Sequence, residues 1–308
     1  MTLAMVFPGQ GSQSVGMQAD LAAAYDVVGA TYAEASEVLG YDLWALSQDD
    51  ADGKLNETEV TQPAMLTAGI AAWRCWQAAG GAQPAMLAGH SLGEYTALVV
   101  AGSLEFADAV GLVRQRAQFM QNAVPAGTGA MAAILGLDDD VVRGVCEAAA
   151  DGEVVSPVNF NSPGQVVIAG SAGAVNRAIE GAKEAGARRA LPLSVSVPSH
   201  CALMEPAAEN MSAVLADTAI SEPSIPVISN VDVAIYDSVD SIRDGLKRQL
   251  YSPVRWVETV QKLIADGATS MVECGPGKVL AGLAKRIDRS VPATCIDSPE
   301  TIEKAMAG

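Results

Sequence analysis

Residues 84–101 read PAMLAGHSLGEYTALVVA, and no other segment of the sequence says more about the fold. An apolar run at 84–89 turns sharply into a helix candidate at 92–101, with the pattern G-x-S-x-G between them. In a nucleophile elbow the serine occupies a strained strand-to-helix turn that exposes its hydroxyl, and the glycines let the two backbones approach. We therefore expect Ser91 to be a nucleophile and the amide of Leu92 to point toward a developing oxyanion.

Strand-like and helical segments alternate on either side of this stretch. Strand candidates are 3–7, 225–229 and 269–274, and helix candidates are 63–79 and 105–124. The alternation predicts an α/β fold with a parallel sheet that carries helices on both faces. Together with the elbow, it predicts a large domain of the α/β-hydrolase type.

The middle of the chain follows a different order. Its expected elements are strand 130–135, helix 138–150 with Asp138 as its cap, strands 154–160 and 165–169 joined by the turn 161–164, helix 172–185 and strand 187–193. The order β-α-β-β-α-β is that of the ferredoxin-like split motif. We expect a small ferredoxin-like domain at 128–195, inserted in a large domain of residues 1–127 and 196–308, with a cleft between them.

The choice of a base for Ser91 is narrow, because the chain contains two histidines, His90 and His200. His90 adjoins the serine in the elbow, where neighbouring side chains point in different directions. His200 directly follows the inserted segment, where a residue would face the cleft, so His200 is the better candidate for a base. A hydrolase triad would add a carboxylate, but no Asp or Glu stands in a motif that identifies it; a backbone or side-chain amide could orient His200 equally well.

Arg116 is the residue that points to a substrate. On the expected helix 105–124, its neighbours three and four positions away are all apolar: Leu112, Val113, Phe119 and Met120. A buried cation without a partner is costly, so something anionic should meet it, and a carboxylate fits the guanidinium fork. The alternatives are an ion pair with a distant Asp or Glu, or a side chain that extends to solvent.

The loop after the first strand candidate reads Pro8-Gly9-Gln10-Gly11-Ser12-Gln13. Its glycines suit a backbone bent close to a ligand, and Gln10 is a candidate for an amide of the oxyanion hole. The spacing to the next glycine, Gly16, is G-x-G-x-x-x-x-G, which does not fit a dinucleotide-binding loop.

Composition excludes several classes of protein. The formal charge of −17 disfavours nucleic acid or an anionic membrane as a partner. No apolar run reaches the roughly 18 residues of a membrane span, and the first residues lack the basic segment of a signal peptide. The five cysteines are scattered without a CxxC pair, which argues against disulfides and zinc; Cys201 is interpreted as a small apolar filler. We expect a cytoplasmic protein without a metal site, and a monomer.

An anionic partner would need a basic patch set against this acidic surface. Two segments supply candidates, namely Lys183, Arg188 and Arg189 in one and Lys278, Lys285, Arg286 and Arg289 in the other. An ordinary solvated face is the alternative interpretation.

A series of motifs runs in order along nearly the whole chain. They are PGQGSQ (8–13), TQPA (61–64), GHSLGEY (89–95), the Arg116 helix ending in FMQ, GAMAA (129–133), NFNSPGQVVIAG (159–170), PSH (198–200), RQLYSPVRW (248–256) and VECGPGKVL (272–280). Together they resemble the malonyl-CoA:acyl-carrier-protein transacylases of bacterial fatty-acid synthesis. One departure is Ala117, where the family pattern has glycine.

This resemblance implies a ping-pong acyltransferase whose partners are malonyl-CoA and acyl carrier protein, with no cofactor beyond the coenzyme A thioester. By the resemblance, Ser91 would carry the malonyl group as an ester, and His200 would act as base and then as acid. The amides of Gln10 and Leu92 would form the oxyanion hole.

The resemblance also assigns the remaining site residues. Arg116 would bind the malonyl carboxylate, and the main-chain carbonyl of Gln249 would orient His200, in place of the missing triad carboxylate. Lys183, Arg188, Arg189, Lys285 and Arg286 would form the patch that meets the acidic carrier protein.

Three other functions remain open. They are a carboxylesterase or thioesterase with the same elbow, a sister acyltransferase of polyketide synthesis or malonate decarboxylase, and a non-catalytic carrier-binding module. Arg116 argues against an esterase for neutral esters, which has no need of a buried cation. The serine, histidine and arginine together argue against a non-catalytic module.

Overall fold

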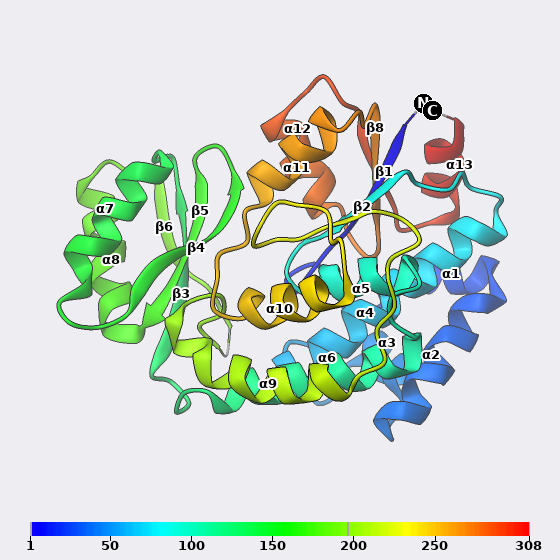
Figure 1. Cartoon of the computed structure of the whole chain (residues 1–308), viewed down its shortest axis with the longest axis horizontal. Helices are drawn as coiled ribbons and strands as arrows, with labels where there is room; N and C mark the ends of the chain where they lie inside the picture. Colours follow the sequence, from blue (N-terminus) through cyan, green and yellow to red (C-terminus); the bar gives the residue numbers. More distant parts are fainter. Residues whose placement is uncertain (1, 196, 308) are drawn as a thin grey trace.

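The computed structural model describes residues 2–195 and 197–307. It is a mixed α/β structure built on two sheets, one parallel and one antiparallel (Figure 1). The expected start of the second part of the large domain, Ser196, and the two chain ends, Met1 and Gly308, lie outside the described residues.

The parallel sheet has the strand order β7-β2-β1-β8-β9. Its strands are β1 (Leu3–Phe7), β2 (Met86–Gly89), β7 (Val227–Ile228), β8 (Ser270–Cys274) and β9 (Ala293–Ile296). β1 lies in the middle, where Ala4 pairs with Met86 on one side and with Met271 on the other. The parallel sheet expected from the sequence is therefore present. β7 is shorter than the expected strand 225–229, because the amide of Ser229 turns to bond the carbonyl of Ala234.

Helices cover both faces of this sheet because its strand residues alternate between two apolar clusters, with Met5 and Phe7 in one and Ala4 and Val6 in the other. On the Met5 side lie α1 (Ala19–Ala24), α2 (Asp26–Leu39), α3 (Leu43–Asp49), α4 (Thr58–Ala78), α5 (Gly93–Val100), α6 (Phe106–Asn122), α9 (Glu205–Asp217), α10 (Val239–Gln249) and α13 (Pro299–Ala307). On the Ala4 side lie α11 (Trp256–Ala265) and α12 (Val279–Ile287) (Figure 1).

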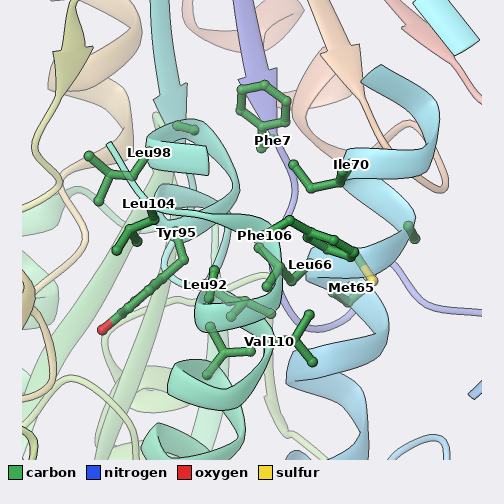
Figure 2. Close-up of a cluster of buried hydrophobic side chains, with 14 of the residues drawn as sticks. Phe7, Met65, Leu66, Ile70, Leu92, Tyr95, Leu98, Leu104, Phe106 and Val110 are labelled. Carbon is green, nitrogen blue, oxygen red and sulfur yellow. The ribbon is translucent and has the colours of Figure 1, made fainter. Parts of the chain in front are cut away.

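Helices α4, α5 and α6 form the support beneath the end of β2. Figure 2 shows Leu66 and Ile70 of α4, Tyr95 of α5 and Phe106 of α6 gathered around Leu92 in this core. Helix α4 begins at Thr58, five residues before the expected start at Pro63, and Pro63 lies inside it. Four of the five added residues are buried, all but Glu59, and this burial accounts for the longer helix.

The antiparallel sheet has the order β4-β5-β3-β6. Its strands are β3 (Gly129–Leu135), β4 (Val155–Ser162), β5 (Gln165–Ser171) and β6 (Arg189–Pro192), and the helices α7 (Asp139–Ala150) and α8 (Ala172–Glu184) pack on it through a cluster of their own. These elements follow the expected order along the chain. Asp138 is the N-cap residue of α7 as expected, but its side chain makes no capping hydrogen bond.

Strand β4 also pairs with the segment between α10 and α11, through an isolated bridge of Asn159 with Val254. The amide of Phe160 donates to the carbonyl of Val254 at 3.0 Å, and the amide of Val254 donates to the carbonyl of Val158 at 2.8 Å. The short 3₁₀ helix η1 (Ala202–Met204) follows His200 and contacts β5. These contacts bring the end of the inserted segment to the elbow.

Candidate active site

Ser91 occupies the sharp turn between β2 and α5. Its φ is 51°, in the left-handed region that is costly for a residue with a Cβ. The turn requires glycine on both sides: a Cβ on Gly89 would lie 1.9 Å from the carbonyl carbon of Gly93, and one on Gly93 would lie 2.0 Å from the carbonyl oxygen of Phe7. The amide of Ser91 donates to Oδ1 of Asn230 at 2.7 Å, which fixes the turn.

His200 meets this serine across the site. Its Nε2 lies 2.7 Å from Ser91 Oγ, and its Nδ1 lies 2.7 Å from the main-chain oxygen of Gln249. A carbonyl oxygen can only accept, so Nδ1 carries the proton and Nε2 presents its lone pair to the hydroxyl. The geometry is that of a base held in the correct tautomer by a backbone carbonyl.

The imidazole of His200 is neutral in this setting. Its side chain is buried, and burial, followed by the positive charge of Arg116, lowers the pKa of His200 to about 3. The hydrogen bond to the Gln249 carbonyl acts in the opposite direction but does not reverse the shift. His200 is therefore unprotonated at neutral pH and able to accept the Ser91 proton.

Arg116 of α6 lies beside the same hydroxyl and is 1% exposed. Its Nη1 donates to Gln62 Oε1 at 2.8 Å and its Nη2 to Gln249 Oε1 at 2.9 Å, while Nη2 lies 3.5 Å from Ser91 Oγ. Its Cζ is 5.5 Å from the centre of the Tyr95 ring. The partners of its closest hydrogen bonds are thus neutral amides from other elements, and the guanidinium faces the nucleophile.

The loop after β1 lies against the elbow from the other side. A Cβ on Gly9 would lie 2.5 Å from the carbonyl oxygen of His90, which shows how closely the two backbones approach. Gln10 and Leu92 both line the cavity at Ser91, and their amides donate no hydrogen bond to a residue that the structure describes. The side chain of Gln10 donates to Thr58 Oγ1 at 3.4 Å.

A cavity of about 280 Å³ lies between the two sheets at this point. One wall carries the polar residues Ser91, His200 and Arg116, and the other is largely apolar, formed by residues such as Met131 and Val167 of the antiparallel sheet. A small, half-enclosed cavity of this kind limits water at the reacting atoms.

Two neighbouring residues are directed elsewhere. Nε2 of His90 lies 2.8 Å from Asn161 Oδ1, and its ring lies against Trp256, so His90 does not meet Ser91. Cys201 is buried, its thiol donates to the carbonyl of Pro198 at 3.2 Å, and burial raises its pKa to about 11. A thiol with so high a pKa is a poor nucleophile, which agrees with a role as an apolar filler.

The family model described as acyl transferase domain matches residues 4–295. The chain belongs to the acyl transferase family. The malonyl CoA-acyl carrier protein transacylase of Escherichia coli strain K12 is 58% identical over 303 residues, which cover 98% of each chain. The crystal structure of an acyl carrier protein S-malonyltransferase from Vibrio cholerae matches with a TM-score of 0.96 and 58% identity, over 99% of this chain and 100% of that one.

A further similar structure was solved together with a carrier protein. It is a malonyl-transacylase in complex with a type II PKS acyl-carrier protein, with a TM-score of 0.98 and 54% identity, over 100% of this chain and 99% of that one. All these matches extend over both sheets, so the cavity between them belongs to the shared fold.

Three polar residues of this acyl transferase site were not anticipated from the sequence. Gln62 bonds Arg116, Asn230 bonds the Ser91 amide, and Glu94 is fully buried beneath the elbow. Gln62 and Glu94 lie inside the motifs TQPA and GHSLGEY, so their place in these motifs could have identified them as site residues. Asn230 follows β7 at the carboxyl end of the parallel sheet, where ligand-binding residues collect.

The part of the chain that the structure describes contains neither a metal-binding cluster nor a membrane-spanning helix. Within it, no three or more His, Cys, Asp or Glu side chains are grouped so as to hold a metal ion. None of its helices is both long and apolar enough to cross a membrane.

Proposed function

We propose that this acyl transferase moves the malonyl group from malonyl-CoA to the phosphopantetheine thiol of acyl carrier protein, in fatty-acid biosynthesis. The observation that carries this proposal is the guanidinium of Arg116, buried within 3.5 Å of the Ser91 hydroxyl that His200 contacts. The site thus combines a nucleophile and its base with a binding group for a carboxylate. The names of the relatives from E. coli and V. cholerae describe the same reaction.

In the first half-reaction, Nε2 of His200 takes the proton of Ser91 as Oγ attacks the thioester carbonyl. The carbonyl oxygen becomes an oxyanion, which the amides of Gln10 and Leu92 would stabilise; both residues line the cavity at Ser91. The carbon–sulfur bond then breaks, and the coenzyme A sulfur leaves with the proton from His200. The Gln249 carbonyl stabilises the transient imidazolium through Nδ1–H.

In the second half-reaction, the carrier thiol gives its proton to His200 and attacks the malonyl-Ser91 ester. The ester carbon–oxygen bond breaks, a new thioester forms, and the proton returns from His200 to Ser91 Oγ. The scheme balances without an oxidant, a reductant or a group beyond the two thiols.

Arg116 distinguishes this function from a hydrolase for neutral esters. Burial lowers the pKa of Arg116 from its ordinary value, so an anion that meets the guanidinium offsets the cost of keeping the charge in this position. The malonyl carboxylate is such an anion and can accept two parallel hydrogen bonds.

Service to a polyketide carrier is a second candidate that one observation favours. The malonyl-transacylase solved with a type II PKS acyl-carrier protein is 54% identical over the whole chain. Transfer rates to a fatty-acid carrier and to a polyketide carrier, measured side by side, separate the two.

We also propose that the molecule is organised as two domains. The large domain would be α/β-hydrolase-like and comprise residues 1–127 and 196–308, and the small domain would be ferredoxin-like and comprise residues 128–195. In support, the small unit has its own apolar cluster, and its strands run β4-β5-β3-β6 with antiparallel neighbours.

The function is tested with radiolabelled malonyl-CoA and acyl carrier protein. We expect label on the carrier with the wild type and none with Ser91→Ala. In Arg116→Ala, malonyl transfer should fall by about a hundredfold or more while acetyl transfer persists, because only the malonyl group has a carboxylate to lose. Rapid release of free malonate without transfer to the carrier would identify a hydrolase and contradict the proposal.

A further inference from the structure

We propose that Glu94 and Gln249 prepare Arg116 for the malonyl carboxylate, with the Gln249 amide acting as a spacer that holds the Glu94 carboxylate near the guanidinium but out of contact with it. This inference rests on the proposed function and deepens it. It makes Glu94, on the first turn of α5, a positioning residue for substrate selection.

Two consecutive hydrogen bonds, from Gln249 to Glu94 and from Arg116 to Gln249, support this inference. Glu94 is fully buried, and its Oε2 accepts from Gln249 Nε2 at 2.5 Å. A carboxylate only accepts, so it compels Gln249 to present its NH₂ group there and turn Oε1 the other way. That oxygen accepts from Arg116 Nη2 at 2.9 Å. Glu94, together with the Ser91 carbonyl that accepts from the same Nε2, thus fixes the orientation of the Gln249 amide, which the sequence does not determine.

Glu94 is itself held in place from several elements. Its Oε1 accepts from the hydroxyl of Tyr236 at 2.5 Å, and the amide of Asn230 lies 3.4 Å from both carboxylate oxygens. The spacer residue is equally fixed, because Gln249 Nε2 also donates to the Ser91 carbonyl at 3.0 Å. The relay therefore ties the guanidinium to the elbow on which the nucleophile lies.

The spacing has an electrostatic consequence. A direct ion pair between Glu94 and Arg116 would occupy the guanidinium fork and compete with a substrate carboxylate. Burial raises the pKa of Glu94 to about 7 and lowers the pKa of Arg116, and with the amide between the two groups each charge still counteracts the shift of the other. A guanidinium has five N–H donors, and its closest hydrogen bonds here go to neutral amides, so donors are left for the substrate.

The decisive variant exchanges the two side chains, as Glu94→Gln combined with Gln249→Glu. The exchange keeps the volume, the charge and a hydrogen bond between the two positions, but it places a carboxylate directly against Arg116. The main-chain carbonyl at position 249 that holds His200 is unchanged. Loading of Ser91 is measured by intact-protein mass spectrometry with malonyl-CoA and with acetyl-CoA, and folding by circular dichroism.

We expect the ratio of malonyl to acetyl loading, as kcat/KM, to fall by about tenfold or more in the exchange variant, mainly through a higher KM for malonyl-CoA. Acetyl loading should also fall, because a carboxylate at position 249 no longer donates to the Ser91 carbonyl, but by a clearly smaller factor than malonyl loading. Tyr236→Phe is the matched control, since it removes one bond to the same carboxylate without touching Gln249, and its ratio should match the wild type.

An unchanged ratio in a folded exchange variant overturns the inference, and so does an equal loss of both activities, which would indicate a merely structural role. If the exchange variant does not fold, Glu94→Gln decides. It removes the carboxylate that turns the Gln249 amide toward Arg116, so the malonyl-to-acetyl ratio should fall by about threefold or more, and a ratio equal to that of the wild type in the folded variant overturns the inference. A wild type that never loads malonyl on Ser91 overturns the proposed function instead.

Discussion

Ser91 and His200, whose side chains meet at 2.7 Å, both have a left-handed backbone, with φ of 51° and 66°. Such conformations cost on the order of 1–3 kcal/mol each outside glycine and persist only where the surroundings fix them. Here the fixing bonds run from the Ser91 amide to Asn230 Oδ1 and from the His200 amide to the Leu250 carbonyl. The left-handed backbone at both residues directs the Ser91 hydroxyl and the His200 imidazole toward each other.

The low pKa of His200 gives a prediction for the pH dependence of transfer. Because burial and Arg116 lower that pKa to about 3, the imidazole stays neutral, and able to act as a base, through the range in which an ordinary histidine becomes protonated. We expect kcat for malonyl transfer at about pH 5.5 to remain above about half of its maximum. Stopped-time assays between acid and neutral pH, with circular dichroism as the control for folding, check this; an acid limb with an apparent pKa near that of free histidine, about 6.5, would contradict it.

Only some of the site residues could be predicted from the sequence. Ser91 followed from the elbow pattern, His200 from the count of two histidines, and Arg116 from an apolar helix face. Glu94 and Asn230 were not predicted because their roles depend on contacts far along the chain, such as the bond between Ser91 and Asn230 over 139 residues. Local patterns carry no information on such pairs.

The elements around the elbow depend on one close approach, that of α5 to β1. A Cβ on Gly93 would lie 2.0 Å from the Phe7 carbonyl oxygen, so Gly93→Ala should force the helix off the sheet. We expect it to lower the free energy of unfolding by about 3 kcal/mol or more and to abolish malonyl transfer. The added methyl group would clash with main-chain atoms, and no flexible side chain is there to move aside.

A glycine in open space provides the control. Gly282 lies in α12 with nothing within 4 Å of an added Cβ, so Gly282→Ala should be neutral or stabilising by up to about 1 kcal/mol, through helix propensity. Urea unfolding of both variants makes the comparison. Equal stability of Gly93→Ala and the wild type would show that the elbow tolerates a methyl group and would refute the packing argument.

Some elements followed from their sequence patterns, and others, including the amphipathic helices α10, α11 and α12, were not predicted. The βαββαβ order of residues 129–192 followed from alternation and turn residues and was confirmed. Helix α2 was missed because its buried face is partly small or polar, with Thr31 and Ala35, and gives little apolar periodicity. Strand β9 has four residues and was too short to distinguish from a loop.

At the scale of the whole molecule, an acidic protein carries basic side chains at the rim of its cavity. Arg286 Nη1 donates to Oε1 of Gln165, which lines the cavity, at 2.7 Å. Gln165 pairs with Leu135, and Leu135 pairs with Arg189, so Arg189 belongs to the same end of the antiparallel sheet. Lys183 of the expected patch is compensated by an ion pair with Glu180 at 2.7 Å and should contribute less.

This arrangement predicts where an acidic carrier protein docks. In the double variant Arg189→Glu with Arg286→Glu, KM for acyl carrier protein should rise by about fivefold or more at low salt, with kcat little changed, because rim charges act on encounter. Lys304→Glu on α13, at the other end of the molecule from the antiparallel sheet (Figure 1), reverses one charge, as each of the two single rim variants does, and as their control it should leave KM unaltered. An unchanged KM in the double variant would rule out this surface.

The arrangement of the two sheets could be predicted only in part from the sequence. The expected parallel sheet is present, and the strands of the expected βαββαβ segment form an antiparallel sheet. The strand order β7-β2-β1-β8-β9 was not predicted, since pairing between distant parallel strands is decided by packing of the whole chain rather than by any local pattern.

The proposed mechanism requires that Ser91 carry the malonyl group as an ester between the two half-reactions. The most direct test is intact-protein mass spectrometry of the wild type mixed with malonyl-CoA in the absence of carrier, followed by peptide mapping. We expect a mass increase of one malonyl group, located on the peptide with Ser91, absent from Ser91→Ala and discharged on addition of acyl carrier protein. An unmodified wild type that still transfers malonyl to the carrier, or a label on another residue, would contradict the account.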